Sequence, residues 1–383
     1  MTPQQLARRI HQSNNRLVMV ITGGASGAIA VVLTVPGASR SVLDTDALKN
    51  FMGSGWQGSG SEKVVRYLAM AAFRRTLERR NACDSSNAAD VLPEQEIIGI
   101  SCSRELASDR SRKGTQAIHA AIQTSRSSHY MLLELQKGNR SCEMEEQLAA
   151  HMILNQIAQA CDIQASVELD LLKTEAFSEQ HTRADPAWRS LLLGDQTLIG
   201  ATPAVRHGME IPNAVFPGAF NPRHEGHTKM ARLAELKLRT DVAFEISLAN
   251  VDKPWLDYTE LATRLDFFKT TEAVWVTRAA TFEEKSCLFP RATFVVGADT
   301  IVRIADPCYY HGPEECERSI QRIVDYGCRF LVFGRQDQNR FQCLSDLDLP
   351  RLLRDICEEV SEQEFRQDIC STALRDTGEQ ENS

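Results

Sequence analysis

The sequence contains no uninterrupted apolar run that approaches the roughly 20 residues of a transmembrane helix. Residues 1–15 are polar and lack the apolar centre of a secretory signal. We therefore expect a protein that does not enter a membrane and that works in the cytoplasm.

An excess of positive charge is also absent. Lys and Arg number 43 and Asp and Glu 51, which gives a formal net charge of -8. Proteins that bind nucleic acid through its backbone need clustered Lys and Arg. The charge balance therefore argues against nucleic acid as a partner, although a small anionic ligand can still be bound locally.

Paired cysteines are missing as well. The chain has 11 cysteines, an odd number, and none of them form a CxxC pair. Zinc sites and disulfide frameworks depend on such spacings. We expect reduced and mostly buried thiols, and no metal site made by the protein's own side chains.

What the sequence does contain is two stretches in which strand and helix patterns alternate, as expected for a chain of 383 residues. In the first domain, 10–165, an apolar run at 17–22, a Gly-rich turn and a second apolar run at 28–35 predict a strand, a turn and a helix. Apolar residues then recur at helical spacing after Ser61, which is a candidate N-cap. Further elements are predicted as strands at 97–100, 115–124 and 130–136 and a helix at 143–161.

Residues 166–212 are polar and contain several prolines, so we interpret them as a linker with some local helix. In the second domain, 213–383, strands and helices alternate again. The predicted strands are 214–216, 242–248, 273–277, 293–296 and 329–333, with helices at 228–238 and 259–270 between the earlier ones. The fold class is therefore α/β in both domains, and the second is expected to be a Rossmann-like doubly wound parallel sheet with ligands at the carboxyl ends of its strands.

A candidate phosphate site lies at the end of the first strand of this second domain. Residues 216–227 read FPGAFNPRHEGH and lead directly into a helix. Gly218 and Gly226 let the backbone approach a phosphate, and the helix N-terminus offers unpaired N–H groups and a partial positive charge. The imidazoles of His224 and His227 can both turn toward one ligand, although a histidine pair in a turn can also be a solvated surface feature.

This string resembles the signature of the HxGH nucleotidyltransferase superfamily. The residues in step with the signature are Phe220, Pro222, His224, Gly226 and His227. A second segment near the other end of the sequence, ICSTALR at 369–375, resembles the superfamily's ISSTxIR motif. The resemblance implies that a phosphate oxygen of an acceptor attacks the α-phosphorus of a nucleoside triphosphate, with release of pyrophosphate.

The same resemblance implies roles for individual side chains. His224 and His227 would hydrogen-bond the triphosphate, Ser371 and Thr372 would hold its β- and γ-phosphates, and Arg375 would act as a charged clamp. Magnesium would arrive with ATP and bridge the phosphates. Taken alone, the Ser-Thr pair also fits an ordinary helix cap. Further nucleotide contacts are assigned to Gly218, Ala219, Phe220 and Gly226.

Two other positions of the second domain are candidates. Residues 297–299, which include Gly297 and Asp299, read GAD and resemble a segment near the nucleotide in nicotinate-mononucleotide adenylyltransferases. Asp299 either contacts ribose or an ordered water, or caps the helix that follows. Lys253, in the loop after the second predicted strand, either binds the acceptor's phosphate or is solvated.

The first domain resembles the C-terminal domain of the competence-damage-inducible (CinA) family, which includes nicotinamide-nucleotide amidases. The resemblance rests on TGG at 22–24, LTVPGAS at 33–39 and KGT at 113–115. It implies a catalytic serine at Ser39, followed in active members by a tyrosine and a lysine. Here no tyrosine follows before Tyr67, and Lys49 is the only nearby base. A serine without an activating partner is a poor nucleophile, so we expect that the amidase chemistry is lost and that the domain is a platform for binding or homo-oligomerisation.

These observations predict an adenylyltransferase of NAD biosynthesis that moves an adenylyl group from ATP to nicotinamide or nicotinate mononucleotide. One alternative keeps the chemistry and changes the acceptor, for instance to phosphopantetheine or a phosphocholine-like compound. The other is a scaffold that binds and senses such nucleotides without turnover.

Overall fold

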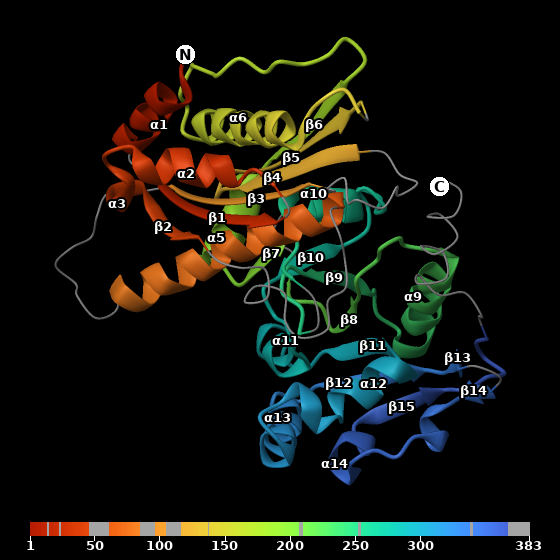
Figure 1. Cartoon of the computed structure of the whole chain (residues 1–383). Coiled ribbons are helices and arrows are strands. Elements are labelled where there is room, and N and C mark those ends of the chain that lie inside the picture. The colour runs from red at the N-terminus through yellow and green to blue at the C-terminus, as the bar shows by residue number, and fades with distance from the viewer. Residues whose placement is uncertain are drawn as a thin grey trace. The chain divides into compact units, whose positions relative to one another are not determined.

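The structure is a computed structural model that describes residues 1–13, 15–22, 24–45, 61–84, 96–104, 116–136, 138–206, 210–251, 254–337 and 340–366. It confirms the predicted α/β class, with two large sheets and helices packed on them (Figure 1). The chain divides into two compact units. Unit 1 consists of Met1–Arg189 with Pro254–Thr259, and unit 2 of Ser190–Lys253 with Glu260–Ser383. No helix among the described residues is both long and apolar enough to span a membrane.

Unit 1 is built on a six-stranded sheet with the order β2-β1-β3-β4-β5-β6. β1 is parallel to β2 and β3, and the pairs from β3 to β6 are antiparallel. The strands are β1 (Arg16–Thr22), β2 (Val42–Thr45), β3 (Ile97–Arg104), β4 (Gln116–Gln123), β5 (Ser127–Leu135) and β6 (Ala176–Arg183).

Helices cover both faces of this sheet, and the apolar side chains of β1 point alternately to the two faces. Leu17 and Met19 pack against several helices on one face, and Val18 and Val20 pack against a single long helix on the other. On the first face lie α1 (Pro3–Gln12), α2 (Ser26–Thr34) and α6 (Cys142–Ala160); α5 (Glu62–Asp84) lies on the second, and α3 (Ala38–Ser41) follows α2. The predicted strand, Gly-rich turn and helix at the start of the chain are thus confirmed as β1 and α2. The Ser61 carbonyl accepts the N–H groups of Val64 and Val65, so α5 begins at the predicted place.

The segment 166–212 differs from the linker that we expected. It contains β6, α7 (Pro186–Leu193), β7 (Leu198–Gly200) and α8 (Pro203–Arg206). The units divide inside this segment, after Arg189. Both strands lie at sheet edges, and nearly every side chain of β6 is exposed. An edge strand of that kind has no apolar alternation by which the sequence could reveal it.

Residues 254–259 belong to unit 1 although the sequence around them belongs to unit 2. The guanidinium of Arg66 on α5 donates to both carboxylate oxygens of Asp257, at 2.6 and 2.7 Å. The buried Tyr258 donates its hydroxyl to the carbonyl of Ser125 at 2.8 Å. These contacts complete the core of unit 1 on the face of the sheet that α5 covers.

Unit 2 is built on a seven-stranded sheet with the order β15-β12-β11-β8-β9-β10-β7. All neighbours are parallel except β7, which runs antiparallel to β10. The strands after β7 are β8 (Ala214–Pro217), β9 (Ala243–Ser247), β10 (Val274–Thr277), β11 (Thr293–Gly297), β12 (Arg329–Phe333) and β15 (Cys357–Val360). From the central β8 the chain builds outward to β10 and then returns to β11 on the other side. In doubly wound sheets, ligands bind at such a switch point, beyond the carboxyl ends of the strands.

The remaining elements of unit 2 connect these strands. The helices are α9 (Glu225–Leu238), α10 (Tyr258–Leu265, whose first two residues belong to unit 1), α11 (Phe282–Leu288), α12 (Ala298–Ile304), α13 (Pro313–Asp325) and α14 (Arg351–Arg354), with 3-10 turns at Pro307–Tyr309 and Leu344–Asp346. A small hairpin joins β13 (Arg335–Asp337) and β14 (Arg340–Gln342).

A buried ion pair joins three of these elements. Glu245 on β9 is 1% exposed and Lys285 on α11 is 6% exposed. The Lys285 ammonium donates to both carboxylate oxygens of Glu245, at 2.8 and 2.9 Å, and to the carbonyl of Ala279 at 2.9 Å. Thr277 at the end of β10 donates its hydroxyl to the same carboxylate. All three ammonium protons thus have acceptors, which a buried charge needs in order to be tolerated.

We predict that Lys285→Met lowers the free energy of unfolding by about 3–5 kcal/mol, because it leaves the Glu245 carboxylate buried without a partner. Chemical denaturation measures the loss, and faster amide exchange in β9 and β10 locates it. Combining the change with Glu245→Gln should recover most of the stability. The exposed pair of Lys229 and Glu225 provides the control, since Lys229→Met should cost less than about 1 kcal/mol. An equal effect at both lysines would contradict the prediction.

Candidate functional site

The site begins where β8 ends, at Gly218. Its N–H donates to the carbonyl of Glu245 on the neighbouring strand at 3.0 Å. Phe220 follows with a φ of 45°, in the left-handed region, and its ring is 1% exposed. A Cβ atom on Gly218 would lie only 2.7 to 3.0 Å from atoms of that ring. Glycine is therefore required here by an internal contact, in addition to the phosphate approach that the sequence suggested.

The Phe220 ring belongs to an aromatic cluster that supports the turn. Its edge-to-face neighbours are Phe216 at 5.5 Å, Phe244 at 5.5 Å and Phe268 at 5.3 Å between ring centroids. His227 also packs edge-to-face on Phe220, at 5.1 Å. The His227 ring therefore has an apolar neighbour on one side. These contacts hold the ring in place without a ligand.

The two histidines lie together at the start of α9. His224 has an extended φ of -135° and immediately precedes the helix, and His227 lies in its first turn. Their ring centroids are 3.8 Å apart with an interplanar angle of 29°. The backbone N–H of His224 donates to Nδ1 of His227 at 3.2 Å. Because Nδ1 of His227 is an acceptor, the proton of the neutral ring is on Nε2 and can be donated to a ligand. The helix begins three residues earlier than the predicted 228.

The surroundings keep both rings neutral. Burial lowers the pKa of His227 to about 3, and the nearby His224 and the positively charged Arg223 add to this effect. Burial also lowers the pKa of His224. Nδ1 of His224 is buried and forms no hydrogen bond with the described residues. The pair is therefore a set of N–H donors and acceptors at a helix N-terminus, where an anion would be stabilised.

Arg223, which the sequence analysis did not assign, fixes the turn from the other side. Its guanidinium lies 4.6 Å from the ring centroids of Phe244 and Phe268 and donates to both carboxylate oxygens of Glu272, at 2.8 and 2.7 Å. Burial alone would raise the pKa of Glu272, but the hydrogen bonds from Arg223 and from the backbone of Lys269 hold it below its ordinary value. The sequence signal was a charged residue directly before the first histidine of the motif.

The predicted residues after β11 are at the same edge of the sheet, since β11 is the parallel neighbour of β8. Gly297 precedes α12 as its N-cap, so Asp299 is the second residue of the helix and not its cap. The Asp299 carboxylate accepts from Arg335 at 2.7 Å, and both side chains remain about half exposed, at 49% and 42%. The ribose contact of Asp299 stays a prediction. Arg335, just beyond the end of β12, is a cation that the sequence analysis missed.

The other assigned residues of unit 2 divide into two groups. Ala219 is exposed in the turn and Gly226 is buried in the first turn of α9, so both lie beside the histidines in the chain. The rest lie outside the described residues; they are Lys253, Ser371, Thr372 and Arg375. Among the residues that are described, no group of three or more His, Cys, Asp or Glu side chains could hold a metal ion.

In unit 1 the predicted serine meets no base among the described residues. Ser39 is exposed on α3, and its hydroxyl forms no hydrogen bond with the described residues. The buried Ser41 contacts Nδ1 of His11 instead, and Nε2 of that ring lies 2.9 Å from the carbonyl of Val32. Tyr67 packs with Lys63 on α5, and Lys49 lies outside the described residues.

The Gly-rich turn of unit 1 binds a carboxylate of the protein itself. The Glu146 carboxylate on α6 accepts the N–H groups of Ala25 and Gly27, at 2.7 and 3.1 Å, and the hydroxyl of Ser26 at 2.7 Å. These donors are at the start of α2, where a helix would otherwise attract an external anion. The carboxylate therefore satisfies that helix terminus internally.

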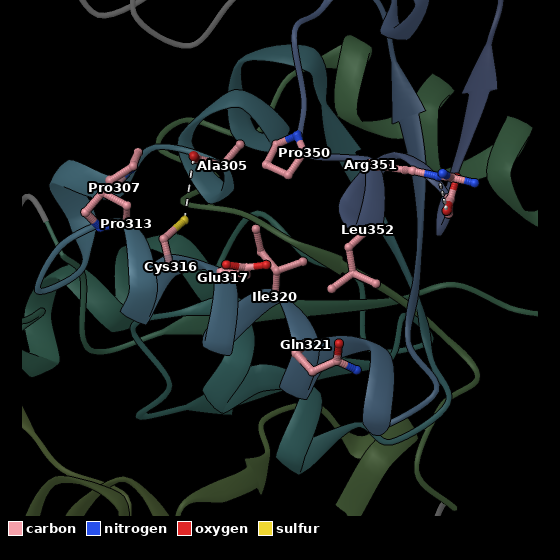
Figure 2. Close-up of a pocket in the computed structure, with 11 residues that line it drawn as sticks. Ala305, Pro307, Pro313, Cys316, Glu317, Ile320, Gln321, Pro350, Arg351 and Leu352 are labelled. Atoms are coloured by element: carbon pink, nitrogen blue, oxygen red, sulfur yellow. Dashed lines mark hydrogen bonds and ion pairs between the residues drawn. The ribbon is translucent and has the colours of Figure 1, made fainter.

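A groove in unit 2 is separate from the histidine turn. It has a volume of about 720 Å³ and lies between α13 and the segment leading into α14 (Figure 2). Its apolar lining includes Pro307, Pro313, Ile320, Pro350 and Leu352. None of the residues assigned from the sequence line it.

We predict that Gly218→Ala displaces the Phe220 ring and lowers the free energy of unfolding by about 1–3 kcal/mol, the usual cost of overpacking. Calorimetry measures the stability, and triphosphate binding should weaken because His227 loses its support. The neighbouring exposed position supplies the control, Ala219→Ser, which should change neither quantity. Equal behaviour of the two variants would show that the ring contact does not constrain the turn.

We also predict a pH-dependent stability term from His227. Its pKa falls from 6.5 in the unfolded chain to about 3 in the folded protein, so the unfolded chain binds this proton first. The contribution is fully present above about pH 6.5 and is lost as the pH falls toward 3. His227→Asn removes it, so the stability difference from wild type should shrink on acidification. His311→Asn, at an exposed histidine of unit 2, is the control, and a difference that is constant with pH would refute the assignment.

Neither a scan against protein-family models nor a search of curated proteins finds a match to this chain.

Proposed function

We propose that unit 2 is a Rossmann-like nucleotidyltransferase that moves an adenylyl group from ATP to a phosphorylated acceptor, nicotinamide or nicotinate mononucleotide, and releases pyrophosphate. The observation that carries this proposal is the stacked pair of neutral imidazoles, His224 and His227, at the N-terminus of α9. This pair follows the central strand β8 at the switch point of the sheet, where doubly wound folds bind nucleotides.

The arrangement suits in-line transfer. A phosphate oxygen of the acceptor attacks the α-phosphorus, the bond from that phosphorus to the bridging oxygen of the β-phosphate breaks, and pyrophosphate carries away the electron pair. No covalent protein intermediate is required, so catalysis depends on positioning and on stabilising the growing negative charge. The Nε2–H of His227 and the N-terminus of α9, with its partial positive charge, are suited to stabilise that charge.

The donors are also held before any substrate arrives. Phe220 packs on Gly218 and supports His227, while Arg223 is fixed between aromatic rings and Glu272. Preorganised donors stabilise a transition state without a cost of reorientation at the moment of reaction. The aromatic cluster therefore supports a catalytic role more directly than a loose phosphate-binding loop would.

The motif resemblance supplies the rest of the proposed site. Ser371, Thr372 and Arg375 would complete the contacts to the β- and γ-phosphates, and Lys253 would bind the acceptor's phosphate. Asp299, which pairs with Arg335, would contact ribose. Magnesium enters as part of the substrate, MgATP.

The preference for a pyridine mononucleotide as acceptor rests on the two resemblances together, because both units resemble proteins that handle such nucleotides. Within unit 1, Ser39 has no described base and Glu146 occupies the start of α2. We therefore propose that unit 1 is not an amidase and acts as a platform for binding or association.

Pyrophosphate release from the full chain tests the proposal, with MgATP and each of nicotinamide mononucleotide, nicotinate mononucleotide, phosphopantetheine and phosphocholine. We expect release only with a pyridine mononucleotide. His227→Ala should lower kcat by about 10²–10³-fold, as loss of one transition-state donor does elsewhere, with an unchanged circular dichroism spectrum. His311→Ala is the control and should keep full activity.

The other outcomes decide between the alternatives. Tight nucleotide binding without pyrophosphate release with any acceptor would mean a sensing scaffold. Release with phosphopantetheine or phosphocholine alone would keep the chemistry and change the substrate. Ammonia release from nicotinamide mononucleotide that is abolished by Ser39→Ala would contradict the loss of amidase activity in unit 1.

A further inference from the structure

The last strand of the unit 1 sheet has one open side. β6 is bonded along its whole length to β5, and no strand among the described residues pairs with its other edge. Figure 1 shows β6 as the terminal strand of this sheet. Every residue of β6 except Thr182 is exposed.

The hydrogen-bonding direction of each residue in β6 follows from one bond. The N–H of Ala184 donates to the carbonyl of Arg126 at 2.8 Å, so Ala184 faces β5. Backbone groups alternate in direction along an antiparallel strand. The even-numbered residues of β6 therefore bond to β5. The residues whose N–H and C=O groups point outward are Phe177, Glu179, His181 and Arg183.

This edge lacks most of the features that prevent pairing with another chain. Natural edge strands carry charged side chains, especially lysine, or proline or a bulge, or they are very short. β6 is 8 residues long, its sequence AFSEQHTR contains neither proline nor lysine, and its register with β5 is unbroken. Its two charged residues, Glu179 and Arg183, have opposite signs, so they can face complementary groups on a second strand. The strand is therefore a ready template for a further strand.

We propose that β6 pairs antiparallel with β6 of a second copy of this chain about a two-fold axis at Gln180, joining two six-stranded sheets. In this register Glu179 lies opposite the partner's His181, and Phe177 lies opposite the partner's Arg183. An imidazole N–H can donate to the carboxylate, and a guanidinium is attracted to a phenyl face. The two-fold axis repeats each pair, so all four outward-facing residues of both copies exchange backbone hydrogen bonds.

The other symmetric registers are less favourable. Outward-facing residues can pair only with outward-facing residues, so the axis must pass through a residue position. Axes other than those at 179, 180 and 181 engage at most two of the four outward-facing residues of each strand. An axis at Glu179 sets two carboxylates directly opposite each other, which is destabilising. An axis at His181 pairs that ring with itself and moves Phe177 beyond the end of the partner strand. The register centred on Gln180 thus combines the longest ladder with complementary side chains.

The charge environment of the edge is compatible with this pairing. Glu179 already contacts Nε2 of His129 on β5 at 3.3 Å through one carboxylate oxygen. The second oxygen remains for the partner's imidazole. The rings of His129 and His181 are 5.2 Å apart, and Arg183 is at the far end of the strand. Only residues of unit 1 are involved, so the inference is independent of the function proposed for unit 2.

Cysteine cross-linking tests the register. With the axis at Gln180, the two copies of that residue form a non-hydrogen-bonded pair with Cα atoms about 4.5 Å apart, which a disulfide can bridge. Mild oxidation of Gln180→Cys should give a covalent dimer on a non-reducing gel. Ser178→Cys is the matched control, because its two copies would be separated by four strand positions, about 13 Å. Wild type controls for the native cysteines.

Sedimentation equilibrium of the full chain tests the interface itself. We expect a wild-type dimer that Glu179→Pro converts to a monomer, since proline removes an outward N–H and leaves the bonds to β5 intact. Glu179→Lys should weaken the dimer about tenfold, and Glu179→Lys/His181→Glu should restore it. A monomeric wild type, equal cross-linking of Gln180→Cys and Ser178→Cys, or no cross-linking of either would overturn the proposal.

Discussion

The buried carboxylate of Glu245 is the constraint on which the candidate site depends. Its side chain binds Lys285 and Thr277, which joins β9 to β10 and α11, and its carbonyl accepts the N–H of Gly218. A charge can be buried in this way only when hydrogen bonds replace its lost hydration. One residue thus connects the carboxyl ends of neighbouring strands to the first residue of the histidine turn. The contacts that stabilise the sheet therefore also position the site.

From Gly218 the constraint extends to the chemistry. The missing side chain admits the Phe220 ring, which carries His227 against an apolar surface and so lowers its pKa to about 3. A ring that is difficult to protonate stays neutral at neutral pH, and it keeps its Nε2–H as a hydrogen-bond donor. The packing of Phe220 therefore determines both the position of His227 and its protonation state.

The sequence predicted those parts of the fold whose signals are local. The strands of unit 2 that lie inside the sheet are mostly apolar, and His224 and His227 are close in sequence, so both could be recognised from short patterns. The edge strand β6 was missed because its side chains are exposed and show no apolar alternation, and β7 was missed because it has only 3 residues. The pairs of Glu245 with Lys285 and of Asp299 with Arg335 join residues that are distant in sequence, and only the folded chain brings them together.

The exposed side chains of β6, which prevented its prediction from the sequence, are also relevant to the proposed role of unit 1. Among the described residues of unit 1, Ser39 forms no hydrogen bond with a base, and Glu146 accepts the N–H groups at the start of α2. The outward-facing residues of β6 include an acid, an imidazole and an arginine at alternate positions. These side chains favour one register over others when β6 pairs with a second copy of itself. A monomeric protein gains from lysine or proline on such a strand, whereas a self-associating one needs complementary side chains there. The composition of β6 fits the second requirement, in line with the proposed role of unit 1 in self-association.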